Sequence, residues 1–295
     1  MAVRPRTRQL ACRAANNMRT ATIVALVAAS IAAAVDAGAY FAPAALSAPA
    51  SALGVKVCAD DQPDVAICRK NALQQAIPML AHGIPSIGAS PIDPLDNLPP
   101  LVFNVNQPGI TINFELKNSR MLGHGRAVLE DLNVDTNAVT IRVLTHVPGE
   151  FIFDGDHTID AYVFGVPYKG SGRFTLVEID SGVEMIYSGH PVPGPDGRTY
   201  LQLTSGECKL DYGATTYKLT GVYGDYPPFV EALGKFITEV TSPVVEKLIA
   251  PPVEAWMADI YRSRAQQVFS TVPFDVLFPK TLAIDGFYRA FYPHY

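Results

Sequence analysis

The chain has 295 residues and a formal net charge of −5 at pH 7. This acidic balance argues against nucleic acid and anionic membranes as partners, because both attract a basic surface. The length is enough for one sizeable hydrophobic core or two small ones.

The first 39 residues have the pattern of a secretory signal peptide. Five arginines within residues 4–19 precede an uncharged run over residues 21–35, and small residues follow at 37–39. A membrane anchor is the alternative, but the run is short for a span of about 20 residues and Ala dominates it. We therefore expect residues 1–39 to be removed and the protein to be secreted, with no integral membrane association. Without these five Arg and one Asp the formal charge is −9. We expect residues 40–56, which begin with a stretch rich in Ala, Pro and Ser, to be a flexible leader.

Three cysteines remain after the signal segment. In a secreted chain the closely spaced Cys58 and Cys68 most simply form a small disulfide loop. Zinc binding is the alternative, but no nearby His pair or second Cys pair supplies further ligands. Cys208 shares an apolar stripe with Leu210 and Tyr212, so we expect a buried, inert thiol rather than a reactive one.

The first predicted helix covers residues 64–81, where apolar side chains recur at helical spacing and Gly83 supplies a stop. Pro78 must kink this helix or lie where a neighbour compensates. The stretch "AIPMLAHGIPSIGASPIDPL" (76–95) runs from the helix into a Pro-rich segment that still contains large apolar residues. We expect this segment to be a packed, extended crossing without regular structure.

The middle of the chain alternates with the period of a β-strand. Apolar and polar side chains alternate over residues 110–117, 139–143, 151–163, 183–187 and 201–203, with turn signals such as "PGPDG" (193–197) between strands. In the longest run, Asp154, Asp156 and Asp160 fall on the polar face. Strands with one apolar and one polar face predict an antiparallel sheet with a single buried side.

The C-terminal region predicts a long helix that covers this apolar side. Its stripe continues past Pro251 and Pro252, which should bend or segment it, and consists of Phe229, Leu233, Phe236, Ile237, Val240, Val244, Leu248, Val253, Met257, Ile260, Ala265 and Val268. The predicted fold class is α+β, with a long bent helix beside a strongly curved antiparallel sheet. Either an ordinary core or a lumen between sheet and helix follows from this arrangement.

Motifs for catalysis or cofactor binding are missing from the sequence. It contains no Gly-x-Ser-x-Gly elbow, and "GHGRAV" (123–128) and "GSGRFT" (170–175) lack the third glycine of a dinucleotide loop. "DGDHTID" (154–160) suggests a calcium loop, but Ile159 and Gly165 stand where the motif needs Gly and Glu. We therefore expect no enzyme activity, no cofactor and no metal site.

His157 falls on the apolar stripe of its predicted strand, between Phe153 and Ile159. A core histidine that bonds to backbone or water is the simpler interpretation. A polar contact with the headgroup of a ligand is the alternative, and a catalytic role lacks a partner pattern.

The chain resembles the insect takeout and juvenile hormone-binding protein family over residues 57–279. The motifs, in order, are Cys58 and Cys68 with nine residues between them, "LAHGIPSIGASPIDPL", "VPYKGSGRF" (166–174) and "VPFDVLFP" (272–279). Hormone carriers of the family often have a second disulfide, but Cys208 has no cysteine left to pair with. In this respect the chain resembles the takeout-like branch, which has one disulfide. Three departures are His157, where the family often has Tyr, "ITEVTSP" (237–243) in the long helix, and the aromatic tail of residues 280–295.

The resemblance implies a tubular lipid-binding fold, in which a curved antiparallel sheet wraps a long C-terminal helix and encloses an apolar tunnel. It also implies a non-enzymatic carrier of a lipophilic small molecule, such as a juvenile hormone-like terpenoid or a fatty acid. Residues 76–95 would then close and line the tunnel mouth. The expected tunnel lining combines facing and resemblance: Ile77, Leu80, Ile84, Ile87, Phe114, Phe153, His157, Ile159, Tyr187, Phe229, Leu233, Phe236 and Val240. Two alternatives stay open: an interaction protein whose tunnel is filled by side chains, and a secreted lipid esterase.

Overall fold

The computed structural model describes residues 56–87, 89–222 and 242–280. The predicted signal peptide, the leader up to residue 55 and the tail from residue 281 lie outside these ranges. The helical elements are α1 (Val65–His82), the 3-10 turns η3 (Pro85–Ile87) and η4 (His124–Arg126), α3 (Ser242–Thr271) and α4 (Phe274–Leu277). The strands are β1 (Leu101–Gln107), β2 (Ile110–Leu122), β3 (Val128–Asp135), β4 (Thr140–Val163), β5 (Val166–Pro193), β6 (Thr199–Asp211) and β7 (Ala214–Leu219).

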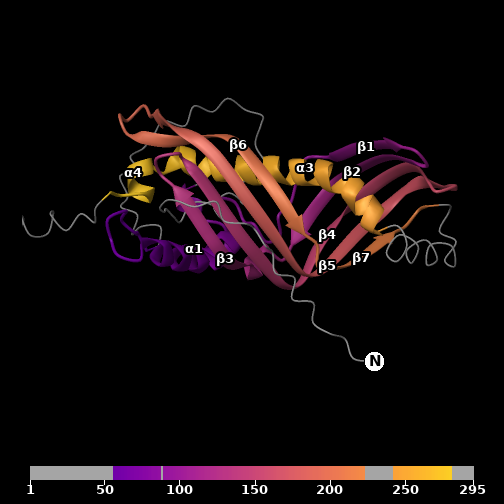
Figure 1. Ribbon diagram of the computed structural model, residues 1–295, viewed down its shortest axis with the longest axis horizontal. Helices are drawn as coiled ribbons and strands as arrows, with labels where there is room; N and C mark the ends of the chain where they lie inside the picture. The colour runs from indigo at the N-terminus through magenta and orange to yellow at the C-terminus, as the bar shows by residue number, and fades with distance from the viewer. Residues whose placement is uncertain (1–55, 88, 223–241, 281–295) are drawn as a thin grey trace, which may run out of the picture.

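The seven strands form one antiparallel sheet built on a long hairpin. Strand β4, of 24 residues, pairs from end to end with residues 166–188 of the 28-residue β5, apart from one register shift. On the outer side of β4, β3 pairs with residues 140–146 and β2 with residues 152–163, extended by β1. On the outer side of β5, β6 pairs with residues 182–193 and β7 with residues 174–179. The hairpin therefore has a β3–β6 half and a β2–β7 half, named for these flanking strands (Figure 1).

The two halves meet at an irregularity in the hairpin. The β4–β5 register shifts between Val147 and Glu150, and Gly149 has φ 75°. The Gly149 N–H donates to the Asp180 carboxylate at 2.9 Å, and Asp180 itself has φ 56°. Such a bulge bends and twists the paired strands, so the hairpin changes direction where its neighbours change.

Burial along the strands confirms the predicted alternation. In β2, Ile110, Ile112 and Leu116 are buried while Thr111 and Asn113 are exposed. The same facing holds along β4, where Phe153, His157, Ala161 and Val163 are buried.

Asp154 corrects one detail of the expected polar face. It points outward with its neighbours Asp156 and Asp160, yet it is only 7% exposed. Arg120 and Arg173, on the strands flanking β4, both pair with its carboxylate. These long side chains lie across the sheet and cover the acid, which the alternation within one strand cannot reveal.

The N-terminal helix agrees closely with the sequence prediction. Cys58 and Cys68 form a disulfide with a Cα–Cα distance of 6.1 Å, which joins the chain before α1 to its first turns. Gly83 ends the helix with φ 81°, and a side chain there would collide with the Ala89 carbonyl, 2.8 Å from the Cβ position. After this turn the segment folds back, and Ile92 and Leu95 are fully buried.

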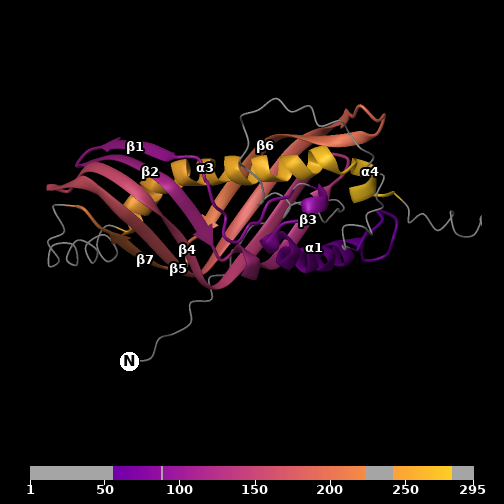
Figure 2. The same cartoon turned by 180° about the vertical axis from the view of Figure 1, so that it is seen from behind.

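Helix α3 is the predicted cover of the apolar face. Pro251 and Pro252 lie inside it, and Figures 1 and 2 show the sheet curling around this helix. Its buried residues include Met257, Ile260, Ala265 and Val268, as the stripe predicted. The part of the stripe that precedes residue 242 lies outside the described residues.

Two glutamines close the edges of the β3–β6 half. Gln74 of α1 donates to the Ala127 carbonyl at 3.1 Å and accepts from the Leu129 N–H at 2.7 Å, beside β3. Gln266 of α3 makes the matching pair with the Leu201 carbonyl and the Leu203 N–H on β6. Each side chain completes the hydrogen bonding of an edge strand, so both edges of this half are joined to helices.

Candidate ligand-binding cavity

A cavity lies between the sheet and α3 at the junction of the two halves, and extends into the β3–β6 half. The elements that form it are β4 and β5 beside the bulge, the end of β6, the residues around η4 and the middle of α3. Its walls are Ile92, Met121, His124, Ala127, Val143, Thr145, Val147, Phe151, Phe153, Leu176, Glu178, Ser181, Gly182, Val183, Met185, Tyr187, Leu210, Tyr212, Val253, Met257 and Tyr261.

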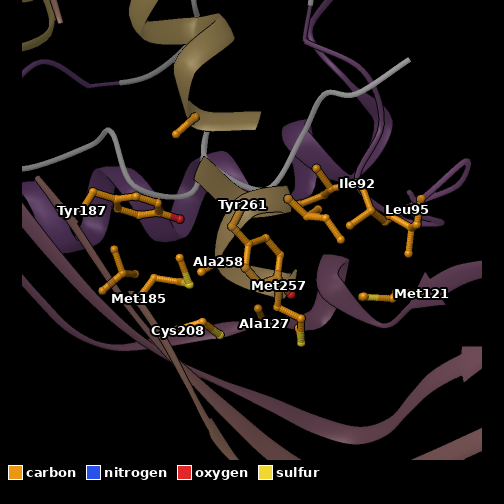
Figure 3. Packing of buried hydrophobic residues seen from close by; sticks show 14 of the residues in the cluster. Ile92, Leu95, Met121, Ala127, Met185, Tyr187, Cys208, Met257, Ala258 and Tyr261 are labelled. Atoms are coloured by element: carbon orange, nitrogen blue, oxygen red, sulfur yellow. The ribbon is translucent and has the colours of Figure 1, made fainter. Parts of the chain in front are cut away.

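The walls are mainly apolar, and three of them are methionines. Figure 3 shows Met257 and Tyr261 of α3 close to Met185 and Tyr187 of β5, with Met121 and Ile92 on the other side. The cavity has a volume of ≈ 100 Å³. A single water needs about 10–15 Å³ on this measure, so the cavity holds several waters or a small apolar group. A longer ligand requires the flexible methionine side chains to rearrange.

His124 and Tyr261 form a polar pair in the cavity wall. The His124 Nε2 and the Tyr261 hydroxyl are 2.9 Å apart, and the two side chains are 8% and 4% exposed. The two rings meet edge to face, and the His124 ring packs in the same way against Phe151. Sequence reasoning missed this pair, because Tyr261 lies 137 residues further along the chain.

Asp93 fixes the position of His124. Its two carboxylate oxygens accept from the backbone N–H groups of Gly123 and Gly125, at 3.0 and 2.9 Å. A Cβ on Gly125 would lie 2.9 Å from Asp93 and 3.0 Å from Ala81. Only glycine allows the turn to approach so closely, and the residues on both sides of His124 are held by one carboxylate.

Burial keeps His124 and the two tyrosines of the cavity wall uncharged at neutral pH. It lowers the pKa of His124 to about 4, with Asp93 opposing the shift and Arg264 adding to it. It raises the pKa of Tyr187 and of Tyr261 well above the usual value. At pH 7 the imidazole and both phenols are therefore neutral hydrogen-bonding groups.

Beyond the cavity, the inside of the β2–β7 half is occupied by aromatic rings. Phe114 stacks on Phe103 at a centroid distance of 5.1 Å, and Phe174 meets Phe114 and Phe153 edge to face at 5.8 and 5.9 Å. Phe153 also packs against Trp256 of α3 at 5.5 Å. We call these residues the ring cluster; its Phe153 forms part of the cavity wall.

The predicted tunnel residues occupy different places. Phe153 and Tyr187 line the cavity. Within residues 76–95, Ile77, Leu80 and Ile87 are buried in the core and Ile84 packs against it. None of these four lines the cavity. Phe114 and Ile159 lie in the β2–β7 half. The four residues predicted on the long helix, Phe229, Leu233, Phe236 and Val240, lie outside the described residues. Ligand contact for all of these residues stays a prediction.

His157 is a core histidine beside the ring cluster. It is 2% exposed, and its ring lies over Phe114 at a centroid distance of 6.3 Å. Within the described residues neither ring nitrogen has a hydrogen bond of normal geometry. Burial lowers its pKa, and the backbone of Gly172, its cross-strand neighbour, opposes the shift.

Cys208 is buried, as the sequence predicted, and stands free of any disulfide. Burial, with Glu254 nearby, raises the pKa of its thiol to about 12. A thiol with such a pKa is a poor nucleophile at neutral pH.

Comparison with known proteins agrees with this geometry. Residues 29–279 match the family described as haemolymph juvenile hormone binding protein. The chain is 39% identical over 238 residues to a protein of Schistocerca gregaria named for beta-carotene binding, covering 80% of this chain and 93% of that protein. No helix among the described residues is both long and apolar enough to span a membrane.

A solved structure supports the fold. Takeout 1 of Epiphyas postvittana superposes with a TM-score of 0.64 at 20% sequence identity, covering 74% of this chain and 97% of that one. The predicted tubular fold, with a curled antiparallel sheet around a C-terminal helix, is confirmed. Because the family match spans most of its length, the chain belongs to the haemolymph juvenile hormone binding protein family.

Proposed function

We propose that the protein is a secreted carrier that binds one lipophilic small molecule in the cavity between the sheet and α3. The observation that carries this proposal is the cavity itself, with its mainly apolar walls between the sheet and α3. The membership of the chain in a family described by hormone binding supports it. Candidate ligands are juvenile hormone-like terpenoids, fatty acids and, from the name of the locust relative, carotenoids.

Hydrophobic burial is enough to supply the affinity. Each CH₂ group removed from water contributes about 0.8 kcal/mol, so ten such groups give about 8 kcal/mol. Before the losses of ligand and side-chain freedom are subtracted, that value corresponds to a dissociation constant of roughly 1 μM. The protein therefore needs no ionic contact to bind its ligand.

The polar groups of the cavity support binding rather than ester hydrolysis. The cavity contains both His124 and Ser181, but the partner of the His124 Nε2 is Tyr261. Within the described residues the His124 Nδ1 has no partner, so the imidazole is not joined to a serine nucleophile as a hydrolase requires.

The ring cluster favours the second candidate, an interaction protein whose interior is filled by side chains. Rings in contact occupy the inside of the β2–β7 half. This candidate differs from the carrier in one measurable property, because it takes up no apolar molecule.

Native mass spectrometry of the protein secreted from insect cells tests the carrier. We expect a bound lipid at a one-to-one ratio, which solvent extraction would then identify, and an N-terminus near residue 40. The stripped protein should also take up a fluorescent apolar probe such as N-phenyl-1-naphthylamine. Protein that is secreted empty and fails to bind this probe, terpenoids, fatty acids or carotenoids would replace the carrier with the filled interaction protein.

A further inference from the structure

The His124–Tyr261 pair has one hydrogen bond left to make. His124 lines the cavity and is 92% buried, and its Nδ1 has no partner among the described residues. A buried polar atom without a partner is costly, because it has given up its hydrogen bond to water and gained none in the protein. In a wall that is mainly apolar, an atom of this kind marks the place where a ligand supplies the missing group.

Both arrangements of the shared proton leave the pair able to bind an oxygen atom. If the Tyr261 hydroxyl donates to Nε2, the proton of the neutral imidazole is on Nδ1, which then offers an N–H donor. If Nε2 donates to the Tyr261 oxygen, the hydroxyl proton is free to donate and Nδ1 accepts. A hydroxyl or carbonyl oxygen on the ligand can accept a hydrogen bond in either case.

The pair is held in place before a ligand arrives. Asp93 fixes the backbone on both sides of His124 through Gly123 and Gly125, and the His124 ring packs against Phe151 and Tyr261. A donor that is already ordered loses little freedom on binding, so more of its bond energy appears as affinity.

The charge state of the pair restricts the class of ligand. Since burial lowers the pKa of His124 to about 4, the imidazole is neutral at pH 7, and the phenol is neutral as well. Two neutral groups offer a carboxylate no ion pair to repay its loss of hydration, and Arg264, whose charge acts on His124, does not line the cavity.

We propose that the His124–Tyr261 pair determines specificity, by binding the uncharged, oxygen-bearing end of an otherwise apolar ligand. This inference rests on the proposed carrier function and adds a polar contact to it. It predicts a preference for alcohols and carbonyl compounds over the corresponding hydrocarbons and free acids, once differences in water solubility are accounted for.

The test combines matched ligands with matched variants. Farnesol, β-farnesene and farnesoic acid share a carbon skeleton and differ in the polar end, and displacement of the fluorescent probe at pH 7.5 gives their dissociation constants. The variant His124→Leu removes the pair, and Tyr261→Phe removes only the hydroxyl. Tyr168→Phe is the control, because it deletes a buried phenol hydroxyl from β5 at a position that does not line the cavity.

We expect His124→Leu to weaken farnesol binding about tenfold, the value of one good hydrogen bond, and to change β-farnesene binding less than twofold. Tyr168→Phe should leave the ratio of the two dissociation constants unchanged. The double variant His124→Leu with Tyr261→Phe should bind farnesol as tightly as His124→Leu alone does, since the two residues act as a unit.

Several results would overturn the proposal. One is an equal loss of affinity for farnesol and β-farnesene in His124→Leu. Another is a change in the ratio of their dissociation constants in Tyr168→Phe, and a third is a loss of farnesoic acid affinity as large as that of farnesol in His124→Leu. Each leaves the carrier intact, because the hydrocarbon still binds. Failure of every ligand to displace the probe in the wild type would instead contradict the carrier itself. Circular dichroism establishes that the variants are folded.

Discussion

The two halves of the β4–β5 hairpin obey the same alternation and contain different interiors. In the β2–β7 half the inward positions carry large rings that pack on one another, as Phe114 and Phe174 do. In the β3–β6 half the inward positions carry smaller or more flexible side chains, such as Val143 and Met185, and a cavity remains. Alternation determines which side chains point inward, while their size and the helix above them determine whether the interior is filled.

The largest difference between the halves should appear on removing a side chain from each. Phe174→Ala deletes a ring that contacts Phe114, Phe153 and Tyr217, and should lower the free energy of unfolding by about 3–5 kcal/mol. Met185→Ala, on the same strand but facing the existing cavity, should lower it by about 2 kcal/mol because the side chain has fewer neighbours to lose. Urea denaturation measures both, and equal losses would mean that the halves are packed alike.

A pH titration of the wild type against His124→Leu should isolate the contribution of the buried His124 at the cavity. His124 has a pKa of about 4 in the folded protein and about 6.5 when unfolded, so between these values the unfolded chain binds more protons. The neutral imidazole of His124 therefore contributes roughly 3 kcal/mol to the free energy of unfolding. This contribution is complete above pH 6.5 and is lost as the pH falls towards 4. Urea denaturation at a series of pH values measures the effect. Over this window the free energy of unfolding of the wild type should fall by roughly 3 kcal/mol more than that of His124→Leu, and parallel curves for the two proteins would contradict a buried neutral imidazole.

The disulfide should matter more to the β3–β6 half than to the other. Replacing Cys58 and Cys68 by Ser opens a loop of sequence separation 10 and should lower the free energy of unfolding by about 2–3 kcal/mol. Because α1 joins the sheet at the β3 edge through Gln74, hydrogen exchange should quicken first in α1 and β3. Equal acceleration in β2 and β7 would show that the two halves open together.

The smallest effect on stability should come from filling the cavity. Val143→Phe places a ring in space that is already empty, so it should change the free energy of unfolding by less than about 1 kcal/mol and weaken probe binding about tenfold. The matched change Ile112→Phe in the β2–β7 half enters a packed interior and should cost about 1–3 kcal/mol. Unchanged probe binding in Val143→Phe would place the ligand outside this cavity.

Local patterns in the sequence predicted much of the fold. The first helix, its stop at Gly83, the Cys58–Cys68 disulfide and the inward faces of β2 and β4 are all present. Each depends on neighbours within a few residues, where helical or strand periodicity and closely spaced cysteines dictate the outcome. The continuity of β4 was not predicted, because Pro148 and Gly149 resemble a chain break, whereas the structure keeps the pairing and forms a bulge.

The sequence by itself determined which residues face inward, since a strand of period two needs only its own side chains to separate an apolar from a polar face. Only the tertiary structure decided where the interior stays open and which polar groups enter it. His124 lies in a stretch that the sequence showed only as a failed dinucleotide motif. Asp93 holds the turn around it, η4, through the N–H groups of Gly123 and Gly125, and there His124 meets Tyr261 of α3. Contacts between residues so far apart depend on the curvature of the sheet and the course of α3, neither of which any local pattern records.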